Sequence, residues 1–82
     1  MIQKAFENVV KGDPVTVVEV KGNCLSSTRD RVSSVKAEHK DGVYGVMMYT
    51  NGGFKLFVPA LELWRTKYTD NVDGKYRVFS LL

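Results

Sequence analysis

The sequence predicts an α+β fold, in which one N-terminal helix packs on a strongly bent, barrel-like antiparallel sheet of roughly five to six strands. The pairs Asp41-Gly42 and Asn51-Gly52 stand between runs of alternating apolar and polar residues. Asp-Gly and Asn-Gly supply the positive φ angles that tight hairpin turns require. Near the N-terminus, by contrast, apolar residues recur at helical spacing.

Residues 1–11 are expected to form the helix. Apolar side chains fall on one helical face, at the spacing i, i+3, i+4, i+7 and i+8, and they are Ile2, Ala5, Phe6, Val9 and Val10. Gly12 is a natural stop, and Pro14 blocks continuation. A helix this short is marginal alone, so we expect it to pack on the sheet.

Residues 12–82 are expected to form the sheet, which makes residues 1–82 a single domain. The β-branched run Val15–Val20 predicts the first strand. The polar stretch Gly22–Asp30 is expected to be a loop, and loops of this length often carry function. A three-stranded meander then follows, over Arg31–His39, Val43–Thr50 and Phe54–Val58.

The rest of the chain predicts one helical turn and a second hairpin. Pro59 cannot donate to a β ladder, but it suits the first position of a helical or 3₁₀ turn. Alternation in Trp64–Tyr68 and Tyr76–Leu82 predicts two more strands, and Thr69–Gly74 between them contains turn-forming Asp-Asn and Asp-Gly. No charge follows Arg77, so an exposed edge there would favour a homodimer through Tyr76–Leu82. The alternative is that this last strand is internal to the sheet.

The composition indicates a small protein with a modest core. The chain has 82 residues, of which 44% are hydrophobic, and at this size about 60% of the unfolded surface is buried on folding. Cys24 is the single cysteine, so no internal disulfide is expected. No signal peptide is evident, and no apolar run reaches the roughly 20 residues that span a bilayer. We therefore expect a cytoplasmic protein without a membrane partner.

One stretch resembles the small barrels of the Src-homology-3-like (SH3-like) and KOW type. Lys11–Val17 places Gly-Asp before a β-branched strand, Asp41-Gly42 and Asn51-Gly52-Gly53 correspond to tight turns of the meander, and Phe57–Leu61 resembles the final turn near a proline. The resemblance covers about residues 11–68. It implies a barrel that binds proteins, RNA or DNA.

Catalytic and metal chemistry find little support in the sequence. Zinc sites need several cysteine or histidine ligands, whereas this chain has one cysteine, Cys24, and one histidine, His39. His39 at a strand end is most simply solvated, and Cys24 is most simply a small filler. The carboxylates are spread along the chain without forming an acid–base pair. We therefore expect a protein that is not an enzyme and that needs no cofactor or metal.

Charge and aromatic content favour nucleic-acid binding as the leading hypothesis. Lysine and arginine total 12 and aspartate and glutamate total 9, which gives a net charge of +3. Single strands are bound by aromatic side chains that stack on bases and by cations that meet phosphates. The predicted site for RNA or another single strand comprises Arg29, Arg31, Lys36, Lys55, Phe57, Arg65, Lys67 and Arg77.

Two alternatives stay open. In the first, Phe57 and Phe79 cover the core and the cations are simply solvated. The second is a protein-binding regulator or inhibitor, of the kind that phages and plasmids often carry, that occludes a surface of a larger partner. Its interface would use the aromatic and methionine side chains that interfaces favour, namely Met47, Tyr49, Phe57, Trp64 and Tyr68.

Overall fold

Six antiparallel strands make up most of the computed structural model, which describes residues 4–81. The strands are β1 (Pro14–Lys21), β2 (Cys24–Lys40), β3 (Val43–Thr50), β4 (Lys55–Pro59), β5 (Lys67–Val72) and β6 (Lys75–Ser80). Two single 3₁₀ turns, η1 (Phe6–Asn8) and η2 (Ala60–Glu62), complete the described elements. Within residues 4–81, no helix is long and apolar enough to cross a membrane.

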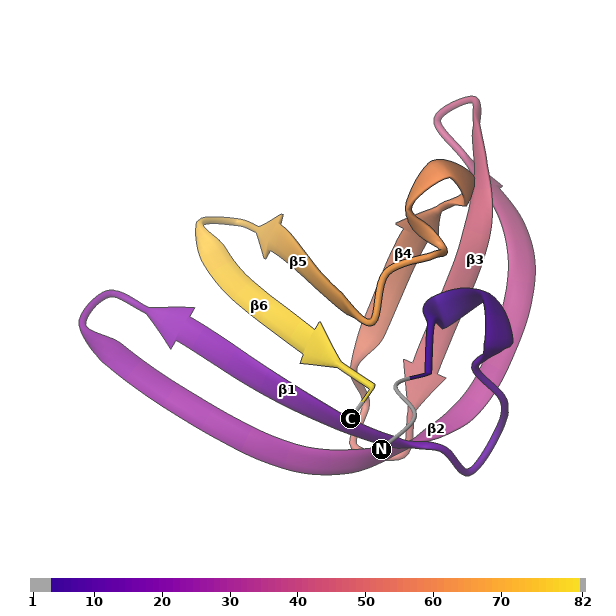
Figure 1. The fold of residues 1–82 in the computed structure, drawn as a ribbon. Helices are drawn as coiled ribbons and strands as arrows, with labels where there is room; N and C mark the ends of the chain where they lie inside the picture. Colours follow the sequence, from indigo (N-terminus) through magenta and orange to yellow (C-terminus); the bar gives the residue numbers. More distant parts are fainter. Residues whose placement is uncertain (1–3, 82) are drawn as a thin grey trace.

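The length of β2 explains how one sheet becomes a near-barrel. All six strands lie in one sheet in the order β4-β3-β2-β1-β6-β5. β2 has 17 residues, and its first half pairs with β1 while its second half pairs with β3. The register shifts between Val32 and Ser34, and such a bulge bends a strand. Figure 1 shows the result: β1, β6 and β5 form one arm, and β3 and β4 form the other.

The hydrophobic core lies between the two arms. Side chains alternate along a strand, and the inward residues Val15 and Val17 of β1 and Leu56 and Val58 of β4 are at most 1% exposed. Phe79 on β6 is fully buried. The whole buried cluster is Phe6, Val9, Val15, Val17, Val32, Met48, Leu56, Val58, Phe79 and Leu81. Burying each large side chain contributes about 1.5–3 kcal/mol relative to leaving it in water.

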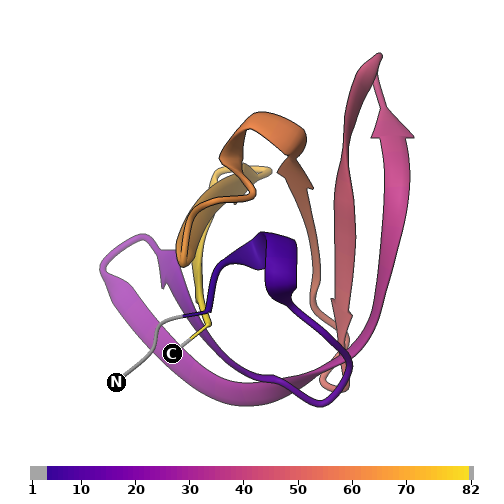
Figure 2. The same ribbon diagram turned by 45° about the vertical axis from the view of Figure 1, so that its right-hand side comes forward.

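The predicted N-terminal helix is wrong. Of residues 1–11, residues 1–3 lie outside the described part, and only η1 is helical among the others, as one 3₁₀ turn. The backbone instead bonds to the segment before β5: the Phe6 N–H donates to Arg65 O and the Glu7 N–H donates to Leu63 O, both at 2.9 Å. Figure 2 shows the N-terminal segment with η1 lying between the two arms. The fold is therefore nearly all β rather than α+β.

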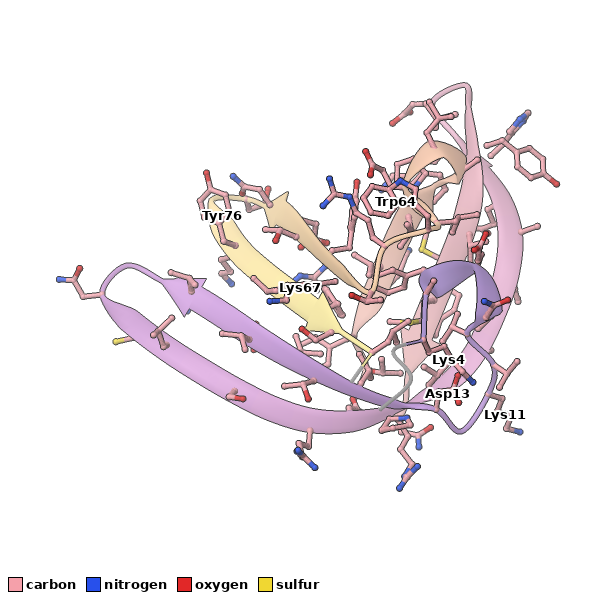
Figure 3. The ribbon with its side chains drawn as sticks, viewed as in Figure 1. Lys4, Lys11, Asp13, Trp64, Lys67 and Tyr76 are labelled. Atoms are coloured by element: carbon pink, nitrogen blue, oxygen red, sulfur yellow. The ribbon has the colours of Figure 1, made fainter. Side chains whose placement is uncertain are left out.

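Packing explains why the helix does not form. A ten-residue helix is marginal in water, and the adjacent β-branched Val9 and Val10 weaken it further. The observed course buries Phe6 and Val9 in the core and leaves Val10 55% exposed. The Asp13 carboxylate then accepts a hydrogen bond from the Val10 N–H at 2.9 Å. It also lies 3.0 Å from the Lys4 ammonium, and the two side chains point toward one another in Figure 3.

The predicted loop over Gly22–Asp30 is also wrong. β1 and β2 form a long hairpin whose turn contains only Gly22 and Asn23, and Ser26, Ser27 and Thr28 pair with β1. Gly22 has a φ of +62°, as the first central position of a type II′ turn requires. Both faces of this outer part of the hairpin are largely exposed, so its strand carries no apolar alternation that could reveal it.

The predicted meander and its first tight turn are confirmed, but the Asn51-Gly52 turn differs from the expectation, because the positive φ falls on Gly53 (93°) and the connection spans residues 51–54. The two-residue turn Asp41-Gly42 has φ angles of 53° and 81°, and Asp73-Gly74 has φ angles of 54° and 80°. Positive φ at both positions defines a type I′ turn, whose twist suits the flanking strands. The helical turn expected after Pro59 is η2. The structure thus confirms a small, strongly bent antiparallel sheet that forms a near-barrel.

The C-terminal strand is internal rather than an edge. β6 pairs with β1 on one side and with β5 on the other. The open edge expected over Tyr76–Leu82 is therefore wrong for the described residues, and Leu82 lies outside them. A homodimer through that strand lacks the unpaired backbone that it required. The sheet's two edges are β4 and β5.

Candidate nucleic-acid interface

A groove of about 480 Å³ lies where the edge strand β4 and the β5–β6 hairpin approach each other. We call it the β4–β5 groove. Its lining is Lys40, Met47, Gly53, Lys55, Phe57, Tyr68, Thr69, Asp70, Asn71, Val72 and Arg77. Three of the predicted site residues, Lys55, Phe57 and Arg77, come together here. The volume falls in the range of about 300–1,000 Å³ that is usual for ligand sites.

Phe57 and Met47 form the apolar wall of the groove. They are directly opposite each other in the β3–β4 ladder. Met47 is only 4% exposed, whereas Phe57 is half-buried. The Phe57 ring packs on bare backbone at Gly45, where an added Cβ would lie only 2.7 Å from Phe57 Cζ. Glycine therefore allows the ring to lie close against β3, with its position set by packing.

Two lysines, Lys40 and Lys55, line the groove together with this ring. The Lys40 Nζ lies 5.9 Å from the centroid of Phe57, which is within cation–π range. Lys55 is two residues before Phe57 on β4 and so projects from the same face of the strand. Neither lysine belongs to an ion pair within residues 4–81. Their charges are therefore available to an anionic ligand.

Arg77, in contrast, is already paired. Its guanidinium donates to the Asp70 carboxylate through Nε at 3.0 Å and through Nη2 at 2.6 Å. These hydrogen bonds to Asp70 raise the pKa of Arg77 above its ordinary value. Nη2 also donates to the Lys55 carbonyl oxygen at 3.0 Å, which joins β6 to the edge strand β4. Arg77 thus holds the two sides of the groove together and adds no net charge beside Asp70.

This arrangement can bind a planar group that carries a negative charge nearby. Phe57 offers an aromatic surface, and Lys40 and Lys55 offer two cations beside it. On the opposite side, the edge strand β5 lines the groove from Tyr68 to Val72, and Asp70 on this strand is paired with Arg77. Aromatic stacking combined with phosphate-binding cations is how proteins hold single-stranded nucleic acids.

The other predicted site residues do not line the groove, although Lys36 shares the face of Met47 and Phe57. Arg31 donates from Nη1 to the Gly12 carbonyl oxygen at 2.8 Å. Arg65 lies 2.5 Å from Glu62 and covers the ring of Trp64, with 5.0 Å from its Cζ to the ring centroid. Lys36 is opposite Met47 in the β2–β3 ladder. Arg29 and Lys67 lie on β2 and β5, on the face of the long arm that points away from the core.

Sequence patterns alone missed Lys40, Asp70 and Asn71 as groove residues. A signal for Asp70 was present, because counting outward from a two-residue turn at Asp73-Gly74 pairs Asp70 with Arg77, as observed. Lys40 has no such signal. It reaches the groove only because β2 and β3 place their turn beside β4.

The described residues do not assemble a metal site or a Cys–His pair. No three His, Cys, Asp or Glu side chains among residues 4–81 gather closely enough to hold a metal ion. Cys24 and His39 lie at opposite ends of β2. His39 packs edge-on against Tyr44 with ring centroids 5.0 Å apart, and Cys24 is exposed.

Comparison of the chain with protein-family models, with curated proteins and with solved structures found no match. Function must therefore be inferred from the groove and the surfaces around it.

Proposed function

We propose that this protein is a non-enzymatic binding module for single-stranded nucleic acid, with RNA favoured over duplex DNA. The observation that carries the proposal is the placement of Phe57 in the β4–β5 groove together with two lysines that form no ion pair within residues 4–81, Lys40 over the ring and Lys55 on the same face of β4. Bases in a duplex are stacked on one another, so only a single strand can turn a base into such a groove. The resemblance to SH3-like and KOW-type barrels supports the same class of ligand.

In this proposal each group has a distinct task. One base stacks on Phe57, and base–aromatic stacking contributes about 1–3 kcal/mol per base. Lys40 and Lys55 neutralise the phosphates on either side of that base. The hydrogen bond from Arg77 to the Lys55 carbonyl oxygen keeps β6 against β4, so that the groove exists before the ligand arrives. A preformed site avoids the cost of ordering side chains on binding.

The first test is fluorescence anisotropy of a labelled U12 RNA at about 50 mM and 200 mM salt. Each lysine–phosphate contact on a single strand contributes about −0.7 to the slope of log K against log salt concentration. The double variant K40E/K55E should lose most of the affinity and flatten this slope by about 1.4. The variant K11E/K21E changes the net charge equally at two exposed positions outside the groove, so it is the matched control. Equal losses in the two variants would contradict the proposed site.

Stacking is tested separately from packing. Phe57→Leu keeps an apolar side chain over Gly45 but removes the aromatic ring, so binding should weaken while thermal stability changes little. Phe57→Tyr should restore binding, because the ring is retained. Weak binding in both variants at unchanged stability would argue against stacking on this residue.

A second candidate function is protein binding, as a regulator that covers a partner's surface. Leu61 is 87% exposed and Trp64 is 64% exposed, and both lie in or beside η2. Figure 3 shows Trp64 on the segment that follows η2, in the upper part of the view and away from Lys67 and Tyr76. Exposed aromatic anchors are typical of protein interfaces. A complex formed mainly by such apolar contacts would survive high salt, whereas the nucleic-acid complex would not.

A further inference from the structure

A row of hydrogen-bond donors crosses the outer face of the long arm. Lys67 on β5 is opposite Ser80 on β6, Ser80 is opposite Thr16 on β1, and Thr16 is opposite Arg29 on β2. These four side chains, the outer row, share one face because strand partners project to the same side. Neighbouring strands lie about 4.8 Å apart, so the row spans about 14 Å.

The outer row is free to act on a ligand. Lys67 and Arg29 are exposed, and Ser80 and Thr16 between them are half-buried. Within residues 4–81, none of the four side chains forms an ion pair with a described residue. None of the four side chains forms a side-chain hydrogen bond with a described residue either. Two cations joined by two hydroxyls are the groups that proteins use to hold phosphate oxygens.

The charge of the surrounding face is one-sided. Outward positions on the four strands of this arm alternate with the buried Val15, Val17 and Phe79. They are occupied by Leu25, Ser27, Arg29, Arg31, Pro14, Thr16, Val18, Val20, Tyr76, Val78, Ser80, Lys67, Thr69 and Asn71. None of these is acidic, and Tyr76 is 51% exposed. The face thus favours a polyanion and offers it an aromatic side chain.

Both ends of the outer row open onto hollows. At the β2 end, Arg29 and Arg31 line a shallow hollow of about 290 Å³ together with Pro14, Asp30 and Asn51. The Asp30 carboxylate in this hollow accepts hydrogen bonds from the backbone N–H groups of Arg31 and Gly52. At the β5 end, Thr69 and Asn71 lie on the outer face and also line the β4–β5 groove. Thr69 is two residues from Lys67 on the same face of β5, so the groove and the outer row adjoin at this edge strand.

We propose that a single strand bound in the β4–β5 groove crosses the edge of β5 and continues along the outer row, with phosphates at Lys67 and Arg29. This inference rests on the proposed function and extends its site to a second surface. Hydroxyls of Ser80 and Thr16 hold the phosphate between the two cations. The combined path fits the footprint of about 4–16 nucleotides that small barrels occupy on single strands.

The experiment compares a labelled U4 with a labelled U12 on the intact protein. U4 fills the groove only, whereas U12 reaches the outer row as well. The variant R29E/K67E should bind U4 as the parent does. For U12 it should lose the additional affinity and flatten the salt slope by about 1.4, because two phosphate contacts are removed. K11E/K21E is again the charge-matched control, and thermal midpoints of all variants show whether folding is intact.

The outcomes separate the two proposals. If neither oligonucleotide binds the parent protein, the proposed function and this extension both fail. If both bind but R29E/K67E matches K11E/K21E on U12, the groove stands and the extension is wrong. A loss on U4 as large as that on U12 would also overturn the extension, because the effect would then be one of overall charge. A Thr16→Ala/Ser80→Ala double variant that weakens U12 alone would support the row without any change of charge.

Discussion

Asp30 on β2 accepts a hydrogen bond from the Gly52 N–H at 2.9 Å, which ties the bend of the long strand to the turn between β3 and β4. The same carboxylate accepts the Arg31 N–H at 2.7 Å. The hydrogen bond from the Thr50 side chain, with those from Arg31 and Gly52, lowers the pKa of Asp30 below its ordinary value. One ionised side chain thus joins the two arms of the barrel beside the bulge at Val32.

This geometry predicts a specific acid sensitivity. The pKa of Asp30 is lower in the folded than in the unfolded protein. The ionised carboxylate therefore stabilises the folded state fully at pH values above the unfolded-state pKa of about 3.9. This contribution is lost as the pH falls through the lower folded-state pKa. Asp30→Asn should therefore lower the thermal midpoint at pH 7 and make the fall in midpoint below about pH 4 shallower. Asp73→Asn removes an equal charge from an exposed turn and should leave the shape of that curve unchanged.

Release of Arg77 should change stability and binding in opposite directions. Asp70→Asn removes the partner of a guanidinium whose side chain is 16% exposed, so unfolding should cost about 1 kcal/mol less. The same change frees one positive charge in the groove, and affinity for U12 should rise about fivefold, the equivalent of about 1 kcal/mol. Thermal melts and anisotropy measure the two effects. Asp73→Asn is the control for net charge. An equal rise in affinity in that variant would show that the effect comes from net charge and not from the groove.

Gly45 should be intolerant of even one methyl group. A Cβ at this position would collide with the Val58 carbonyl oxygen and lie 2.7 Å from Phe57 Cζ. The neighbouring β4 backbone cannot yield freely, so Gly45→Ala should destabilise the fold by about 1–3 kcal/mol. It should also weaken U12 binding, because the Phe57 ring must move. Val43→Ala, at an exposed position on the same strand, should change neither property by much.

The parts of the fold that local chemistry encodes could be predicted from the sequence. Asp41-Gly42 and Asp73-Gly74 adopt the positive φ angles that their residue types favour, so the hairpins around them follow. The N-terminal segment could not be predicted in this way. Its apolar spacing suits a helix, but burial of Phe6 and Val9 and backbone pairing with Leu63 and Arg65 outweigh a helix too short to persist alone.

The candidate site likewise contains residues that the sequence could predict and contacts that it could not. Lys55 and Phe57 share a face because they are two residues apart on one strand, and the sequence shows that directly. Lys40 joins them only through the pairing of β2, β3 and β4, which puts it on the same face of the sheet as Phe57. Arg77 was predicted as a free cation, yet the register of β5 and β6 pairs it with Asp70. Contacts between strands depend on register, and a single sequence constrains register only where a tight turn can be placed.

The two cations Arg65 and Lys67 are neighbours in sequence but should behave differently in binding. Arg65 is paired with Glu62 at 2.5 Å and lies over Trp64, so its charge is already satisfied. Lys67 is exposed at the end of the outer row. Lys67→Glu should flatten the salt slope of U12 binding by about 0.7, the value for one phosphate contact on a single strand. Arg65→Glu should leave the slope unchanged, although it changes the net charge by the same amount.

The comparison of these two variants distinguishes local contact from overall charge. A general electrostatic attraction acts over about 10 Å at 0.1 M salt, so it would make both variants weaken binding by similar amounts. Contact with one phosphate depends on the position of the side chain, and only Lys67 has an unpaired ammonium beside Ser80 on the acid-free face. Arg65→Gln serves as a further control, because Glu at that position would face Glu62 and lower stability by repulsion. Equal slopes for Lys67→Gln and Arg65→Gln, which each remove one positive charge, would remove Lys67 from the binding surface.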